Sequence, residues 1–422
     1  MADGTQITIS VRHYAILSVI CCIALFGFYQ QSADIVFNAG PLVENVIGDT
    51  KVTFKELFNK RVISERPKTL SKPIGTYNSS KTLSKPIRTY HSSAWEQWWL
   101  DNIEQQEKSR TICETIISHE HTREFLNATA SKRYEDWLYF DDHTHGGVWF
   151  NVKNGKFSGS IDGPSFCPEG VSCYTLLFAP PITRSEFDPA IFSWFETKYE
   201  NGVVTRDYIE PLVGHLRHPM ACRLQPGQPW LVDRTYIVPP PAHMLKPGAR
   251  AHYYDAGASV WCSGPGGGSL CFFTRLWEDN GITFDRIRAW DGGASQEAAE
   301  KSYPAAWKPK IQFSSSWVST SAEQPDAFVP LLIKAETKKD DYVLFKLDID
   351  HGDTEIAIVN YMVDESNDVL EWIDEFVWEQ HCTNYIMAQN WLNTIDPTKT
   401  IRDSYQYFLK LRQRGVRAHS YV

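Results

Sequence analysis

Hydrophobic and polar positions follow two patterns in the C-terminal part of the chain, one typical of buried strands and one typical of helices. Short apolar runs such as "AHYYDAG" predict buried strands, and apolar positions three and four apart in "SLCFFTRLWEDNG" predict a helix that Gly281 ends. Strands are expected at 251–257, 284–290, 310–318, 341–350, within 370–381 and at 416–422, and helices at 269–281, 325–336, 353–365 and 403–415. This alternation predicts an α/β domain over 250–422, built on a mostly parallel sheet covered on both faces.

Residues 95–249 show a mixture of helix and hairpin patterns, which predicts an α+β lead-in region before the α/β domain. "AWEQWWLDNIEQQ" begins an amphipathic helix, and the alternation and turn residues of "GGVWFNVKNGKFSGSI" predict a hairpin. "AIFSWFETKYENG" (190–202) is expected to be a helix, and "DYIEPLVGHLRHP" (207–219) a helix followed by a turn.

Residues 31–94 are expected to form a flexible stem. They contain a tandem repeat, "KTLSKPIGTYNSS" at 68–80 and "KTLSKPIRTYHSS" at 81–93, whose two copies differ at two positions. The repeat is rich in Lys, Ser, Thr and Pro and offers little apolar surface to bury.

The uncharged stretch at 14–29, "YAILSVICCIALFGFY", predicts either a membrane signal-anchor over 14–30 or a signal peptide cleaved near "QQSA". In the first case residues 1–13 are a cytosolic tail and the protein is a single-pass type II membrane protein. Both alternatives place the remaining chain in the lumen of the secretory pathway, and the Golgi is the expected compartment. The net charge of −9 argues against nucleic acid as a partner.

Cysteines and sequons fit a lumenal location. Cys167 and Cys173 flank a short turn and are the best disulfide candidate among the seven cysteines outside the apolar segment. Asn78 and Asn127 begin N-glycosylation sequons.

Acidic side chains recur where the predicted parallel strands end, which is the edge where doubly wound sheets bind ligands. The candidate residues are Asp255, Gly257, Asp291, Asp348, Asp350, Glu379 and His381. Gly257 would let the backbone approach a ligand, so a valine there should block binding and leave the fold largely intact. A carboxylate at 291 could accept both ribose hydroxyls of an adenosine. The His-containing runs at 118–121 and 141–145 lack a completing partner, and no metal site is assigned.

The motifs "YYDAGAS", "AWD", "VLFKLDIDHGDTEIAIV" and "IDEFVWEQH" resemble, in this order, those of the FkbM-type methyltransferases, a branch of the Rossmann-like S-adenosylmethionine-dependent enzymes. The resemblance covers roughly 250–422. It implies that Asp255, Gly257 and Ser259 line the cofactor loop and that Asp291 holds the ribose. Asp348 and Asp350 would lie near the methyl group and the acceptor. Trp261 departs from the family pattern, which often has glycine there, and His351 interrupts its acidic–glycine pair.

Three functions remain open at this point. The first is a lumenal O-methyltransferase acting on a glycan or another hydroxyl acceptor, with Asp350 or His381 as the base. The second is a metal-dependent glycosyltransferase that uses Asp348-x-Asp350 on a nucleotide sugar. The third is a lumenal protein that keeps the methyltransferase-like fold without catalysis.

Overall fold

The computed structural model describes most of one compact unit, Thr82–Val422. The described residues are 87–108, 115–116, 118–130, 132–134, 137–141, 147–151, 156–158, 187–199, 202–213, 236–258, 260–262, 268–383 and 398–421. The apolar stretch at 14–30, Ser259 and the Cys167–Cys173 pair all lie outside these ranges. Within the ranges, no helix is long and apolar enough to span a bilayer.

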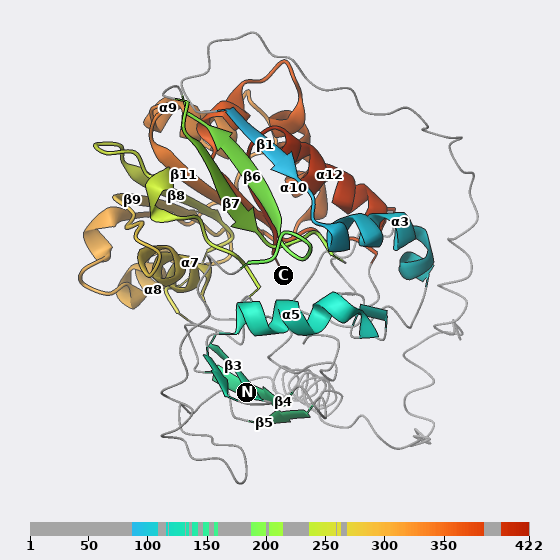
Figure 1. The fold of residues 1–422 in the computed structure, drawn as a ribbon. Helices are drawn as coiled ribbons and strands as arrows, with labels where there is room; N and C mark the ends of the chain where they lie inside the picture. Colours follow the sequence, from blue (N-terminus) through green and yellow to red (C-terminus); the bar gives the residue numbers. More distant parts are fainter. Residues whose placement is uncertain are drawn as a thin grey trace, which may run out of the picture. The chain divides into compact units, whose positions relative to one another are not determined.

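A six-stranded sheet, entirely parallel, forms the centre of this unit (Figure 1). Its strands are β8 (Ala251–Ala256), β9 (Arg286–Trp290), β10 (Ile311–Ser314), β11 (Tyr342–Leu347), β12 (Glu375–Trp378) and β13 (Arg417–Ser420). Their order across the sheet is β10-β9-β8-β11-β12-β13. The chain therefore winds outward from the centre in both directions, the doubly wound order of Rossmann-like folds, and the switch point lies between β8 and β11.

Helices connect the parallel strands, as the sequence pattern predicted. They are α7 (Ser269–Glu278), α8 (Gln296–Ser302), α9 (Val329–Glu336), α10 (Gly352–Val363) and α12 (Ile401–Gln413). Short 3-10 turns lie at Ala242–Met244, Lys308–Lys310 and Val369–Trp372. Every residue of β8 and β11 is buried, because helices cover both faces of a doubly wound sheet. The expected α/β domain with a parallel sheet is confirmed.

The lead-in region contains α3 (Ala94–Lys108), α5 (Glu120–Thr129) and two antiparallel sheets. The first sheet has the order β2 (Lys132–Tyr134), β3 (Trp137–Asp141), β4 (Gly147–Asn151) and β5 (Lys156–Ser158). It includes the predicted hairpin, since β4 and β5 pair antiparallel. The second has the order β1 (Ile87–His91), β6 (Ser193–Lys198) and β7 (Val204–Ile209).

The helices expected within 190–202 and at the start of 207–219 are wrong, because these segments contain β6 and the end of β7. Residues of β6 alternate between buried and less buried positions, with Ser193, Phe195 and Thr197 inside. That period of two is a strand signal, and pairing with β1 on one side and β7 on the other satisfies the backbone.

Strand β1 lies within the segment that was expected to be a flexible stem, in the second repeat copy. Arg88 and His91 occupy the two positions at which the copies differ, where the first copy has Gly75 and Asn78. The Arg88 guanidinium lies 3.2 Å from the buried Asp374 carboxylate, and the His91 ring stacks on Trp194. Both residues that distinguish the second copy from the first thus make contacts that hold β1 in place.

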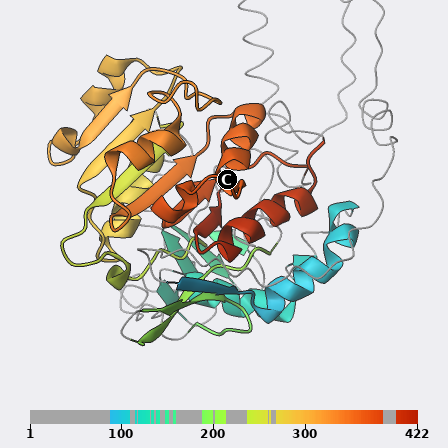
Figure 2. The same ribbon diagram turned by 90° about the horizontal axis from the view of Figure 1, so that it is seen from above.

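A buried charged network joins the β1-β6-β7 sheet to α12 and β13. Its members are Glu96, Glu210, Glu375, Arg412, Arg417 and His419. His419 lies between two carboxylates, with Nδ1 2.8 Å from Glu210 and Nε2 2.5 Å from Glu375. Glu96 on α3 accepts a hydrogen bond from Tyr405 of α12, and both views show α3 beside α12 (Figures 1 and 2). The three acids balance the two arginines when His419 is protonated.

Candidate functional site

The candidate site lies at the carboxyl ends of β8, β9, β11 and β12, around the switch point of the sheet. Gly257 follows β8 with φ +98°, a conformation that side chains other than glycine rarely adopt. A Cβ atom there would lie 1.5 Å from the Asp348 carbonyl oxygen. The absence of a side chain at Gly257 thus lets the backbone after β8 pack directly against the backbone after β11. The expectation that valine at 257 would leave the fold largely intact is therefore wrong.

Lys346 links the ends of β8 and β11. Its buried ammonium lies 3.2 Å from Asp255 and 2.9 Å from Asp348. It also donates to the carbonyls of Gly257 and Asp348, both at 3.3 Å. Burial alone would lower the pKa of Lys346, but Asp255 and Asp348 raise it above its ordinary value, so the side chain stays charged. Lys346 belongs to the "FKLDID" run but was missed as a site residue.

Asp255 is fully buried and its oxygens contact protein groups. One oxygen faces Lys346, and the other accepts hydrogen bonds from Tyr253 and from Ser269 at 2.6 Å. Ser269 is the first residue of α7, so Asp255 ties the end of β8 to the start of the next helix. This geometry makes Asp255 a residue that positions the loop.

The described residues on either side of the glycine run contact each other. A Cβ atom on Gly268 would lie 2.3 Å from the Trp261 carbonyl oxygen, so the last glycine of the run allows the loop to pack against itself. A disulfide joins Cys262 in the loop to Cys271 in the first turn of α7, with Cα atoms 5.3 Å apart. Sequence reasoning had favoured a different pair and did not find this one.

Removing the Cys262–Cys271 disulfide should lower the free energy of unfolding by about 2–3 kcal/mol, because the bond closes a short loop. Denaturant unfolding of a Cys262→Ser/Cys271→Ser variant measures the loss. Wild-type protein treated with dithiothreitol should unfold at the same midpoint as this variant. If dithiothreitol shifts the variant as much as the wild type, the stabilisation comes from elsewhere.

Asp291 follows β9 and is half-buried. Its Oδ1 accepts hydrogen bonds from the backbone N–H groups of Gly293 and Ala294, at 2.8 and 3.1 Å. For Oδ2, no hydrogen bond to another described residue is present. The Trp317 ring lies over Gly292, where a Cβ atom would come within 2.2 Å of the indole, and the tryptophan is 67 % exposed. An exposed indole therefore lies over Gly292, the residue that follows Asp291, and the sequence analysis did not predict Trp317 as a site residue.

Asp350, Glu379 and His381 come together at the ends of β11 and β12. The His381 Nε2 atom lies 3.2 Å from Glu379 and 3.7 Å from Asp350. Burial and the Asp348 carboxylate raise the pKa of Glu379 to about 8. Burial acts to lower the pKa of His381, but Glu379 and other nearby carboxylates raise it to about 9. At neutral pH the imidazole is protonated and becomes available as a base only at higher pH.

Glu355 on α10 holds the strand ends next to this cluster in place. Its carboxylate accepts hydrogen bonds from the Ile349 backbone N–H and the Trp378 indole N–H, both at 3.0 Å. Burial raises the pKa of Glu355 to about 7. Glu355 thereby fixes the backbone that precedes Asp350, and His351, which caps α10, follows directly.

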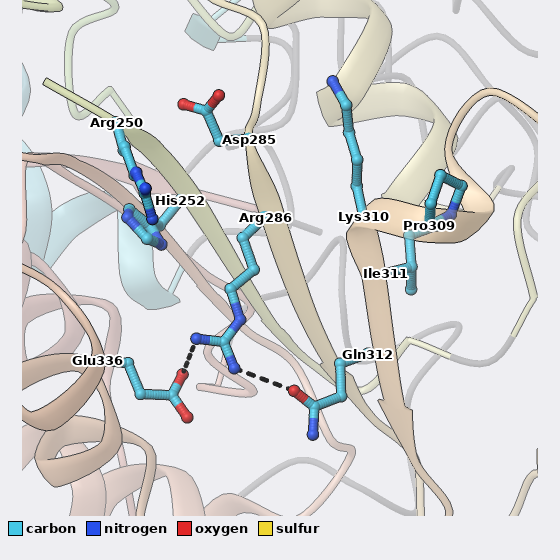
Figure 3. A pocket seen from close by; sticks show the side chains of 9 residues that line it. All are labelled: Arg250, His252, Asp285, Arg286, Pro309, Lys310, Ile311, Gln312 and Glu336. Atoms are coloured by element: carbon cyan, nitrogen blue, oxygen red, sulfur yellow. Dashed lines mark hydrogen bonds and ion pairs between the residues drawn. The ribbon is translucent and has the colours of Figure 1, made fainter. Parts of the chain in front are cut away.

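A pocket of about 510 Å³ lies at the opposite edge of the sheet, at the amino ends of β8, β9 and β10 (Figure 3). Arg250, His252 and Lys310 line it together with Arg286, which is held by Glu336 and Gln312 (Figure 3). None of the predicted site residues lines this pocket. Doubly wound sheets bind their ligands at the carboxyl edge, so no role in the proposed chemistry is assigned to it.

The fold and the site define an α/β protein with a doubly wound parallel sheet and a charged cluster at its switch point. Comparison of the chain with family models, with curated proteins and with solved structures gives no match.

Proposed function

We propose that the protein is an S-adenosylmethionine-dependent O-methyltransferase that acts on a glycan or another hydroxyl acceptor. The observation that carries the proposal is the combination at the end of β9: Asp291, whose hydrogen bonds to described residues use Oδ1, and an exposed Trp317 over the next residue, Gly292. The carboxylate suits the ribose hydroxyls of an adenosine cofactor, and the indole face suits stacking of its adenine. The cofactor would supply the methyl group.

The surrounding residues fit this proposal. Gly257 lies next to the switch point, where the rest of the cofactor would extend toward β11, and Ser259 remains a predicted cofactor residue outside the described ranges. Asp348 and Asp350 follow β11, and Asp350 is 67 % exposed at its side chain and so available to an acceptor. Methyl transfer depends mainly on holding the acceptor oxygen in line with the methyl group, and rigid strand ends suit that task.

The glycosyltransferase hypothesis receives less support from the geometry. A nucleotide-sugar metal would need Asp348 and Asp350 together, but the Asp348 carboxylate lies 2.9 Å from the Lys346 ammonium. The Cys262–Cys271 disulfide supports an oxidising compartment, in line with the lumenal location proposed from the apolar N-terminal stretch.

Asp291→Ala should weaken binding of S-adenosylhomocysteine by about 1–3 kcal/mol, because the ribose hydroxyls lose their acceptor. Isothermal titration calorimetry on the full chain measures this change. Asp340→Ala is the matched control, since it removes the same charge from an exposed residue just before β11, at the opposite edge of the sheet. Equal affinities in the two variants would remove Asp291 from the cofactor site.

A further inference from the structure

We propose that Asp350, Glu379 and His381 form a binding site for one divalent cation. They are the one group of three or more His, Cys, Asp or Glu residues, among those the structure describes, whose ligand atoms converge within 4.8 Å of one another. The group combines two carboxylates and an imidazole from the ends of two neighbouring strands. The cation-binding proposal does not depend on the proposed methyl transfer.

The spacing of the ligand atoms suits a small cation. Metal–oxygen bonds of about 2.1 Å at right angles place neighbouring ligand atoms about 3.0 Å apart and opposite ligands about 4.2 Å apart. His381 Nε2 lies 3.2 Å from the Glu379 oxygen and 3.7 Å from the Asp350 oxygen. These separations leave room for a cation among the three atoms after small side-chain adjustments.

His381 provides a second and independent indication of a ligand. Its side chain is 1 % exposed, and Nε2 is aimed at the two carboxylates. Neither ring nitrogen has a hydrogen-bond partner with acceptable geometry among the described residues. The geometry directs Nε2 at both carboxylates, as in a metal ligand set, and a cation bound there would displace the imidazole proton.

Charge balance and backbone geometry favour the same site. Lys346 is paired with Asp255 and Asp348, and among the described residues His381 is the cationic group that forms an ion pair with Asp350 and Glu379. Among the described residues Asp350 is the non-glycine residue with positive φ, at 55°. Such a conformation costs free energy and is found where a side chain must be directed to a particular point. Once Glu379 is ionised, a divalent cation would balance the two carboxylates of the cluster.

The chemistry of the ligands indicates which cation to expect. Carboxylate oxygens suit Mg²⁺ and Mn²⁺, and a single imidazole shifts the preference toward Mn²⁺ or another transition metal. The exposed side of Asp350 leaves positions on the cation open to solvent. If the proposed methyltransferase function holds, an acceptor hydroxyl could bind there and lose its proton more readily.

Electron paramagnetic resonance of Mn²⁺ added to the full chain at pH 8, without any cofactor, tests the site. We expect about one bound Mn²⁺ per wild-type chain, and binding at least about tenfold weaker in Glu379→Gln and His381→Gln. Asp350→Asn provides a variant at an exposed side chain, so its loss of binding cannot be attributed to disruption of the core. Asp353→Asn, the same change at an exposed residue of α10, should bind as the wild type does.

Three outcomes would overturn the proposal. The first is that the wild type binds no Mn²⁺. The second is that Asp350→Asn binds Mn²⁺ as tightly as Asp353→Asn does. The third is that all four variants lose binding equally. The first outcome would make the cluster an ion pair only. Because no cofactor is present, failure here leaves the methyltransferase proposal standing. Failure of cofactor binding in a protein that holds Mn²⁺ would leave the cation site standing.

Discussion

Lys346→Met is expected to lower the free energy of unfolding by about 3–5 kcal/mol at pH 7, because it leaves two acidic groups without their cation. Asp255 is fully buried and Asp348 accepts the shortest of the Lys346 contacts, at 2.9 Å. Methionine fills a similar volume, so the decrease in the free energy of unfolding reflects the lost charge more than lost packing. Urea unfolding followed by tryptophan fluorescence measures it.

Lys334→Met is the matched control for this experiment. Lys334 pairs with Asp368, and both side chains are about one third to one half exposed. The same substitution at such a surface ion pair should cost less than about 1 kcal/mol. If the two variants lose equal stability, Lys346 does not hold the strand ends together in the way described. Burial acts to raise the pKa of Asp348, but Lys346 lowers it below its ordinary value, so the stability that this pair contributes is lost as the pH falls through the folded-state pKa.

His419→Gln should cost about 3–5 kcal/mol at pH 6 and less at higher pH, because the imidazolium pairs with two buried carboxylates. Burial would lower the pKa of His419, but Glu210 and Glu375 raise it above its ordinary value. A raised pKa in the folded protein means that this contribution is fully present below about pH 6.5. It is lost as the pH rises through the folded-state pKa.

The difference in free energy of unfolding between wild type and His419→Gln should therefore decrease as the pH is raised from 6 upward. Taking the difference cancels the contributions of other titrating groups, such as Glu355 and His381. His243→Gln serves as the control, because the His243 side chain is 46 % exposed. A difference that is constant from pH 6 to pH 10 would show that His419 is not charged in the folded protein.

The sequence predicted the doubly wound region well because its signals are local. Buried strands such as Tyr342–Leu347 are continuous apolar runs, and Gly281 and Gly415 mark helix ends with φ of 85° and 86°. The start of α12 was expected at Asp403 or Ser404. It lies at Ile401, because Thr400 forms a capping box with Asp403. The recurrence of acids at strand ends pointed to Asp350, Glu379 and His381, whose side chains lie together in the structure.

What the sequence did not predict depends on partners far away along the chain. Strand β6 lies between β1 and β7, and the apolar content of "AIFSWFETKYENG" is compatible with a helix until those partners are known. The pairing of Cys262 with Cys271 depends on how the loop folds back on α7. Trp317 became a site candidate only through its position over Gly292. Lys346 could have been predicted as a site residue, because it is a lysine inside an otherwise apolar strand and a buried charge needs a partner.

The central claim is that the carboxyl edge of the sheet binds S-adenosylmethionine. Thermal unfolding of the full wild-type chain with S-adenosylmethionine, S-adenosylhomocysteine or a nucleotide sugar with Mn²⁺ tests it most directly. A ligand that binds only the folded state, at 100 times its dissociation constant, should add about 2.7 kcal/mol of stability. The account predicts a rise in the midpoint with the first two ligands, and with the nucleotide sugar and Mn²⁺ no rise beyond that caused by Mn²⁺ alone. No rise with S-adenosylmethionine or S-adenosylhomocysteine at millimolar concentration would contradict it.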